Sequence, residues 1–250
     1  MSLTIIYRIS DNGHTAGKFS FATKLYCLSN FLYASAPYTK MIRRIHILID
    51  NTNLKKETLE GINNLTSKFP DIESHLYHGG SSAQSWVRSY EYFLDLKLGE
   101  DDAVLFQEDD YLYLTGFPHI ILEGLNRGVH YIAPYLHGDR FIPKSKGGNP
   151  FVDDSASFAT RFFKTDNRFW VQVESTTMTF ATTSRTIKED GEIWKEYTMK
   201  GTYPRDFEAF LALTRKGRTI ASPVPTLSTH CMEQWKSPLI GTCYTDWRQI

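Results

Sequence analysis

The sequence predicts an α/β fold in which one mostly parallel, Rossmann-like central sheet is flanked by helices. Two observations support this prediction. Short apolar runs alternate with longer amphipathic segments through the first half of the chain, as expected of a parallel sheet with helical crossovers. Polar residues follow directly after the apolar runs, and ligands of such sheets bind beyond the carboxyl ends of the strands.

The first half supplies the alternating elements in order. The apolar runs predict strands over Leu3–Ile9, Ile45–Ile49, Glu73–Tyr77, Ala103–Phe106 and Val129–Ala133. Apolar stripes of helical period, ended by proline or glycine, predict helices over Phe19–Ala34, Lys55–Phe69, Ser82–Leu98 and Gly116–Arg127. Right-handed crossovers then bring the strands into one sheet.

The second half has a different pattern. The polar, glycine-rich stretch Leu136–Asn149 predicts a mobile loop, and the alternating stretch Ser175–Thr183 predicts a strand. A helix is expected over Asp206–Arg215, followed by a short strand over Arg218–Ala221. We expect one domain over residues 1–250, with residues 1–135 binding a nucleotide-sugar and residues 136–250 binding an acceptor.

Composition narrows the function classes. Lys+Arg and Asp+Glu both number 28, so the net charge of zero argues against binding of nucleic acid, which needs a basic face. The 3 cysteines are too few for a disulfide framework, which favours a reducing compartment. The N-terminal stretch carries no signal-peptide pattern, and no apolar run is long enough for a transmembrane segment. We therefore expect a cytoplasmic protein.

An acidic cluster follows the strand predicted over Ala103–Phe106. Glu108, Asp109 and Asp110 repel one another unless water or a cation offsets their charges. Oxygen ligands favour Mg²⁺ or Mn²⁺, which also bind phosphates and stabilise a diphosphate leaving group. The alternative is a solvated loop whose acids cap the next segment.

The stretch AVLFQEDDYLYL, which contains this cluster, resembles the Asp-x-Asp element of GT-A glycosyltransferases. The preceding stretch, GGSSAQSWVRSYEYFLDLKLGEDDAVLF, resembles the glycine, helix and strand before that element in family-2-like members. The resemblance implies a single-domain GT-A fold, Asp110 as a direct metal ligand, and Glu108 and Asp109 near the ribose or metal-bound water. It also implies that Arg88 lies near the donor diphosphate. The first residue of the element is Glu here rather than Asp, so the roles of the three carboxylates stay open.

Two aspartates lie where a parallel sheet presents polar groups to a base or ribose. Asp11 follows the first predicted strand and Asp50 follows the second. Arg8, inside the first strand, would line the same pocket or pair with an acid. Turn formation and helix capping are the alternative for both aspartates. The sequence has no GxGxxG and no GxxxxGK[ST], which removes the main support for dinucleotide and P-loop sites.

The segment TYPRDFEAFLALTRKG resembles the later acidic helix of the same family. The resemblance implies Asp206 as the catalytic base, with Glu208 in reserve, although Arg205 stands where the family usually has Glu. His230, in PTLSTHCMEQW, matches the third metal ligand of these enzymes, and a neutral imidazole suits Mn²⁺ better than Mg²⁺. The neighbouring Cys231 is expected in the core.

Aromatic side chains in the second half are candidates for stacking on an acceptor sugar. These are Trp170, Trp194, Tyr203 and Trp235. Thr177 and Thr179 would offer hydroxyl contacts, with Met178 and Phe180 facing inward. The loop around Gly147 and Gly148 would close over the donor as a lid.

Together these motifs predict a metal-dependent glycosyltransferase. It would move a sugar from a UDP- or GDP-linked donor to a glycan or other hydroxyl acceptor, with inversion if Asp206 is the base. Retaining enzymes share the sheet and the acidic cluster, so both outcomes stay open. One alternative is a nucleotidyltransferase that makes nucleotide sugars, although SDNGHTAGK poorly matches its expected glycine- and lysine-rich loop. The other is a non-catalytic carbohydrate-binding protein.

Overall fold

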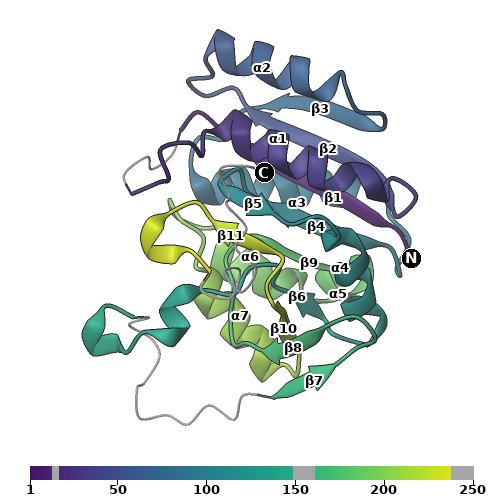
Figure 1. Ribbon diagram of the computed structural model, residues 1–250, viewed down its shortest axis with the longest axis vertical. Coiled ribbons are helices and arrows are strands. Elements are labelled where there is room, and N and C mark those ends of the chain that lie inside the picture. The colour runs from purple at the N-terminus through teal and green to yellow at the C-terminus, as the bar shows by residue number, and fades with distance from the viewer. Residues whose placement is uncertain (13–16, 149–160, 238–250) are drawn as a thin grey trace.

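The computed structural model describes residues 1–12, 17–148 and 161–237 of the chain. Its centre is a nine-stranded sheet with the strand order β3-β2-β1-β4-β9-β6-β10-β8-β7 (Figure 1). The strands are β1 (Leu3–Ile9), β2 (Ile42–Asp50), β3 (Ile72–Tyr77), β4 (Ala103–Gln107), β6 (Tyr131–Ile132), β7 (Phe162–Lys164), β8 (Phe169–Gln172), β9 (Phe180–Thr183) and β10 (Ile220–Val224).

Most strands of this sheet point the same way. β1 pairs in parallel with β2 and β4, β2 with β3, and β6 with β10. Among the described strands of the sheet, only β9 and β8 point in the opposite direction to the others. The sheet is therefore mostly parallel, and the ends of β1 to β4 meet at one edge.

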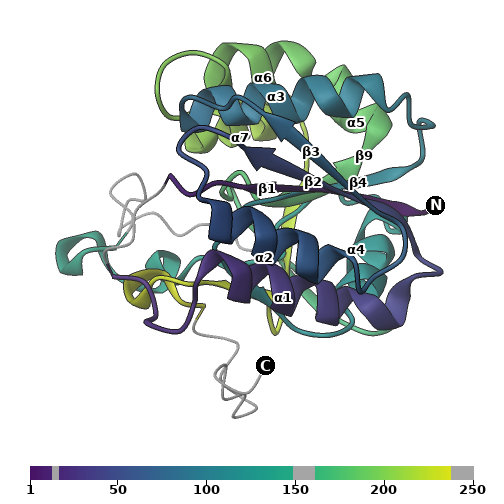
Figure 2. The ribbon, with the colours of Figure 1, turned by 90° about the horizontal axis from the view of Figure 1, so that it is seen from above.

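Helices cover both faces of the sheet (Figure 2). One face carries α1 (Lys24–Ser35), α2 (Lys56–Thr66) and α4 (Phe117–Asn126), and the other carries α3 (Ser82–Asp95), α5 (Ser184–Glu189), α6 (Gly191–Thr198) and α7 (Asp206–Arg215). Alternate residues of β1 feed the two layers, with Ile5 packing toward α1 and Ile6 toward α3. Full burial of such a side chain stabilises the fold by about 1.5–3 kcal/mol.

Several predicted elements have the expected bounds. β1 and α7 match the predicted ranges, and α3 begins at Ser82 as predicted. α1 begins at Lys24, later than the predicted Phe19, because the Thr23 hydroxyl accepts a hydrogen bond from the Tyr26 backbone N–H and caps the helix there.

The second half departs further from the predictions. The strand predicted over Ser175–Thr183 is shortened to β9 and runs antiparallel between β4 and β6. Residues 138–141 and 144–146 of the predicted loop form short 3₁₀ helices, and residue 149 lies outside the described part. A small second sheet pairs β5 (Tyr111–Tyr113) with β11 (Ser228–His230) and places His230 opposite Tyr111. No helix in the described ranges is both long and apolar enough to cross a membrane.

Candidate functional site

A cavity of about 600 Å³ opens where β1 to β4 end. Side chains from these strand ends, from α1, from the start of α3 and from β11 meet in it. Its walls are formed by Arg8, Ile9, Ser10, Asn12, Lys18, Lys24, Asp50, Tyr77, Gly80, Ser81, Ser82, Ser85, Glu108, Asp109, Asp110, Thr202, Tyr203, His230 and Met232. Most of the residues predicted to bind the nucleotide or the metal therefore share one cavity. This is expected, because ligands of parallel sheets bind beyond the carboxyl ends of the strands.

The three consecutive carboxylates each pair with a cation. Glu108 Oε1 lies 3.3 Å from Arg8 Nη2, and Lys24 Nζ pairs with Asp109. Lys18 Nζ lies 3.3 Å from Asp110 Oδ2. We call Glu108, Asp109 and Asp110 the strand-end cluster. Its repulsion is offset within the chain, which explains how three acids can stand side by side in a half-buried place.

Asp110 and His230, the two predicted metal ligands, also meet. His230 Nε2 lies 3.5 Å from Asp110 Oδ2, and the backbone N–H of Cys231 donates to the Asp110 carbonyl at 2.9 Å. Burial raises the pKa of Asp110, but nearby cationic groups outweigh it and hold the pKa below its usual value. Burial lowers the pKa of His230, which favours the neutral ring. Its Nδ1 accepts a hydrogen bond from the Met232 backbone N–H at 3.2 Å, so Nε2 carries the ring proton, and a metal ion on Nε2 would require that hydrogen bond to be given up.

The Arg8 guanidinium is buried, but some of its N–H groups have no hydrogen-bond partner in the described part of the chain. Its side chain is 6% exposed, and its Nε and Nη2 atoms lack a hydrogen-bond partner among the described residues. The guanidinium lies 5.8 Å from the Trp86 ring centre. Unmet donors on a buried guanidinium that faces a cavity are suited to an anionic ligand.

The turn between β3 and α3 brings backbone close to Asp50. Gly79 N–H donates to Asp50 Oδ1 at 3.0 Å, and a Cβ at Gly79 would lie 2.3 Å from Asp50 Oδ2. Gly80 has φ +79°, which favours glycine. The Ser81 hydroxyl then caps α3 by accepting from Gln84 N–H. The turn thus presents the N-terminus of α3 to the cavity, where a helix favours anions.

Asp206, the predicted base, begins α7 and is half-buried. It is not one of the residues that line the cavity, but Thr202 and Tyr203, just before it, are. Burial raises the pKa of Asp206 to about 6. Burial also raises the pKa of Glu108 to about 7, and the nearby charges of Asp110 and Asp206 add to this rise. Asp206 is thus close enough to act electrostatically on the strand-end cluster. Glu208 lies in the same helical turn.

Two predicted donor residues are not brought into the cavity. Asp11 accepts from the Lys55 backbone N–H at 2.7 Å and from the Thr58 hydroxyl at 2.9 Å, so it caps α2 instead. Arg88 points from α3 into an ion pair with Glu91 at 2.9 Å and is largely exposed.

The acceptor predictions need correction as well. Trp170 and Trp194 are fully buried in the core, so their rings are closed to a ligand. Tyr203 is 69% exposed and lines the cavity. Thr179 donates to Glu108 Oε2 at 3.2 Å, and Thr177 bonds the Tyr111 hydroxyl at 2.8 Å. Met178, Phe180 and Cys231 are buried, as predicted.

Lys18 and Lys24 line the cavity and pair with Asp110 and Asp109, and neither was predicted from the sequence. Lys24 is in the first turn of α1, where the helix dipole disfavours a cation. Burial lowers the pKa of Lys24, but Asp109 and Asp110 outweigh it and raise the pKa above its usual value. A lysine in the first turn of a predicted helix could therefore have indicated a nearby carboxylate. Lys18 lies in a bridge to Met232 and had no comparable signal.

Comparisons with known proteins show the fold. No family model matches the chain, and no curated protein matches its sequence. A crystal structure of GalNAc-T7 with UDP, GalNAc and Mn²⁺ superposes with a TM-score of 0.57 at 11% identity. The match covers 94% of this chain and 45% of GalNAc-T7, so the chain spans less than half of that protein.

A second structure, 4-diphosphocytidyl-2C-methyl-D-erythritol synthase from Anaerococcus prevotii, gives a TM-score of 0.49 at 14% identity over 88% of this chain and 85% of that one. The likeness to GalNAc-T7, together with the sheet described above, shows that the chain has a GT-A-like fold.

Proposed function

We propose that the protein is a glycosyltransferase that uses a nucleoside-diphosphate sugar and a divalent cation. The observation that carries the proposal is the buried Arg8 guanidinium, with unmet donors, facing a cavity that also holds the strand-end cluster. A metal-bound diphosphate carries both signs of charge, so it can exchange with the ion pairs that now join the strand-end cluster to Arg8 and the two lysines. The GT-A-like fold and the GalNAc-T7 structure with UDP and Mn²⁺ are consistent with it.

The donor would lie along the strand ends. Asp50 and Ser10 line the side of the cavity at β1 and β2, where we place the nucleoside. The diphosphate would bind Arg8 and the N-terminus of α3, where Ser82 and Ser85 add hydroxyl groups. A UDP- or GDP-linked sugar is the proposed substrate class.

Asp110 and His230 would hold the cation. The 3.5 Å between Asp110 Oδ2 and His230 Nε2 suits two ligands of one ion, since ligands about 2.1 Å from a metal at right angles lie about 3 Å apart. A mixed oxygen and imidazole set favours Mn²⁺ over Mg²⁺. When bound, the ion neutralises the diphosphate as it leaves. Lys18 contacts the same Asp110 oxygen and would have to move aside.

Asp206 would act as the base. The acceptor oxygen attacks the anomeric carbon, the bond from that carbon to the diphosphate breaks, and the acceptor proton passes to the Asp206 carboxylate. A pKa of about 6 suits this role, because the group is mostly ionised at neutral pH yet basic enough to take a proton. This arrangement gives inversion at the anomeric carbon. Glu208 is the reserve candidate.

The test is transfer by purified protein from a panel of UDP- and GDP-sugars with Mn²⁺, measured as release of nucleoside diphosphate and as glycosylated product. We expect Asp206→Asn to lower kcat by about 10²–10⁴-fold while nucleotide affinity is kept. Glu208→Gln is the matched control and should cost less. Pyrophosphate release from a nucleoside triphosphate and a sugar phosphate would reject the proposal in favour of nucleotidyl transfer. Sugar binding without nucleotide or metal would favour a carbohydrate-binding protein.

A further inference from the structure

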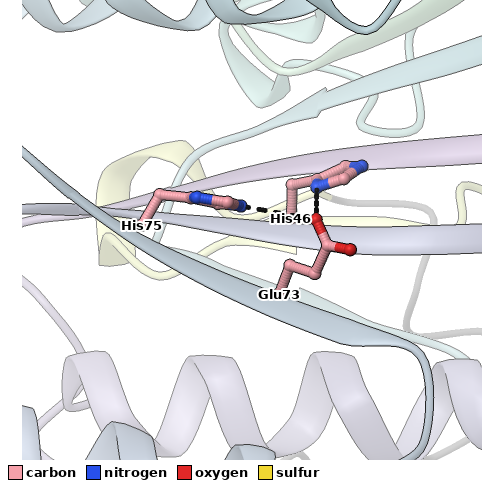
Figure 3. Close-up of side chains that lie close together, drawn as sticks. All are labelled: His46, Glu73 and His75. Carbon is pink, nitrogen blue, oxygen red and sulfur yellow. Dashed lines mark ion pairs between the residues drawn. The ribbon is translucent and has the colours of Figure 1, made fainter.

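A second group of possible metal ligands lies away from the strand ends (Figure 3). His46 is in the middle of β2, and Glu73 and His75 are on the edge strand β3. The parallel register pairs His46 with Glu73 and Leu48 with His75. Because side chains alternate along a strand, all three project from the same face of the sheet, the face covered by α3.

The distances between the ligand atoms fit one bound ion. His46 Nδ1 lies 3.3 Å from Glu73 Oε2, and His75 Nε2 lies 3.6 Å from the same oxygen. All three atoms are within 4.8 Å of one another. In a tetrahedral zinc site with bonds of about 2.0–2.1 Å, neighbouring ligand atoms are about 3.3–3.5 Å apart. The two distances to the Glu73 oxygen therefore already match such a site, and the two ring nitrogens lie within 4.8 Å of each other.

Surrounding groups orient the three ligands. Arg44 binds Glu73 Oε1, which leaves Oε2 turned toward the histidines. The Tyr92 hydroxyl, from α3, lies 2.9 Å from His46 Nδ1 and 2.7 Å from His75 Nε2. These are the same two ring nitrogens that would bind an ion, so the hydroxyl now occupies the space between them. The Glu73 and His75 side chains are 39% and 37% exposed, so an ion has a route from solvent, whereas His46 is buried.

We propose that His46, Glu73 and His75 form a second metal site, specific for a zinc-class transition-metal ion. Two imidazole nitrogens and one carboxylate oxygen suit Zn²⁺, Co²⁺ or Ni²⁺, whereas Mg²⁺ and Ca²⁺ prefer oxygen ligands alone. The Tyr92 hydroxyl, which contacts both ring nitrogens, would become the fourth ligand or move aside. The ion would join edge strand β3 to β2. Because β3 ends at Tyr77, which lines the strand-end cavity, the site would steady one wall of that cavity.

The test is calorimetric titration of the chelator-stripped full chain with ZnCl₂ and, separately, MgCl₂, without nucleotide. Asp110→Asn is the reference protein, because it disables the strand-end site. We expect one Zn²⁺ per chain, bound at least about tenfold more tightly than Mg²⁺, and Co²⁺ should give the absorption of a tetrahedral ion. Glu73→Gln and His75→Ala should each weaken Zn²⁺ by about 10–100-fold or more, since even outer partners of ligands contribute that much.

His119→Ala is the matched control, because His119 lies on α4 across the sheet. It should keep the Zn²⁺ affinity of the reference protein. Thermal unfolding of the zinc-free variants checks that they fold, and in folded variants the Zn²⁺-induced rise in Tm should disappear. Equal Zn²⁺ affinity in Glu73→Gln, His75→Ala and His119→Ala would overturn the proposal, as would Mg²⁺ binding as tightly as Zn²⁺. In that case the three side chains form only a hydrogen-bonded cluster around Tyr92. No outcome depends on sugar transfer.

Discussion

The strand-end cluster and the group of His46, Glu73 and His75 are built in opposite ways. The first consists of consecutive residues beyond the end of one strand and lies in a large cavity. The second consists of residues from the middle of two strands, joined by their register on one face at the sheet edge. A strand end leaves room for a ligand of many atoms, whereas the face of a sheet under a helix leaves room for an ion alone.

Their charges differ too. The strand-end cluster has three carboxylates, each paired with a cationic side chain, and Arg8 retains unmet donors. The histidine group has one carboxylate, paired with Arg44, and two rings. The first can exchange its internal ion pairs for a ligand that carries both signs of charge. The second offers lone pairs to a cation and nothing to an anion.

The largest expected effect is on nucleoside-diphosphate affinity, which should depend on Arg8 and not on Arg44. Arg8→Gln should weaken nucleoside-diphosphate binding by about 100-fold or more, because hydrogen bonds to charged groups are worth about 1.5–3 kcal/mol each. Arg44→Gln, in the histidine group, is the matched control and should leave that binding unchanged. Calorimetric titration with Mn²⁺ present measures both, after circular dichroism shows that both variants fold. Equal losses in the two variants would contradict the separate roles.

Asp206, the proposed base, and Glu73 of the histidine group should also differ in how pH affects stability. Burial raises the folded-state pKa of Asp206 to about 6, above an unfolded value of about 3.9. The folded state then holds the extra proton between these values, so the stability that this group contributes is lost as pH rises from about 4 to 6. Asp206→Asn should be more stable than the wild type at pH 7.5, by up to about 3 kcal/mol, with no gain below about pH 4.

Glu73 should behave in the opposite sense. Burial alone would raise its pKa, but the Arg44 guanidinium holds that pKa below its usual value. Its contribution is present at neutral pH and lost as pH falls, so Glu73→Gln should be less stable than the wild type at pH 7.5. Urea unfolding at several pH values measures both variants. The same sign of change in both would refute the contrast.

The smallest expected effect concerns Lys18. Because it contacts the Asp110 oxygen that we assign to the metal, Lys18→Ala should raise Mn²⁺ affinity by about twofold to fivefold, the worth of a partly exposed ion pair. Lys195→Ala removes an exposed lysine that pairs with Glu192 on α6 and should leave Mn²⁺ affinity unchanged. Mn²⁺ titration of both variants is the measurement. Weaker Mn²⁺ binding in Lys18→Ala would instead make this lysine part of the anion site.

Features that depend on a few neighbouring residues could be predicted from the sequence, whereas features that depend on distant residues could not. β1 and α7 were predicted to the residue, because an apolar run and an aspartate-to-glycine helix pattern are complete within a few residues. The strand-end cluster was found for the same reason. The antiparallel direction of β9 was missed, because strand direction depends on pairing partners distant in the sequence.

The same distinction holds for single side chains. Trp170 and Trp194 were predicted on the acceptor side, but composition does not reveal which aromatic rings the core will enclose. The His46, Glu73 and His75 group had no sequence signal, because only the register of β2 against β3 brings it together. For Asp11 the sequence offered nucleotide binding and helix capping with equal weight, and the contacts with Lys55 and Thr58 at the start of α2 could not be foreseen from local sequence.

The proposed nucleotide site at the strand ends depends on a bound divalent ion. Thermal unfolding with UDP, GDP, CMP and ADP, each with and without Mn²⁺, tests this site most directly. A ligand at 100 times its Kd adds about 2.7 kcal/mol of stability. We predict that one nucleotide raises Tm only with Mn²⁺, beyond Mn²⁺ alone, and that the rise is lost in Asp110→Asn but kept in His75→Ala. No rise with any nucleotide would contradict the claim, and so would a rise that survives Asp110→Asn unchanged.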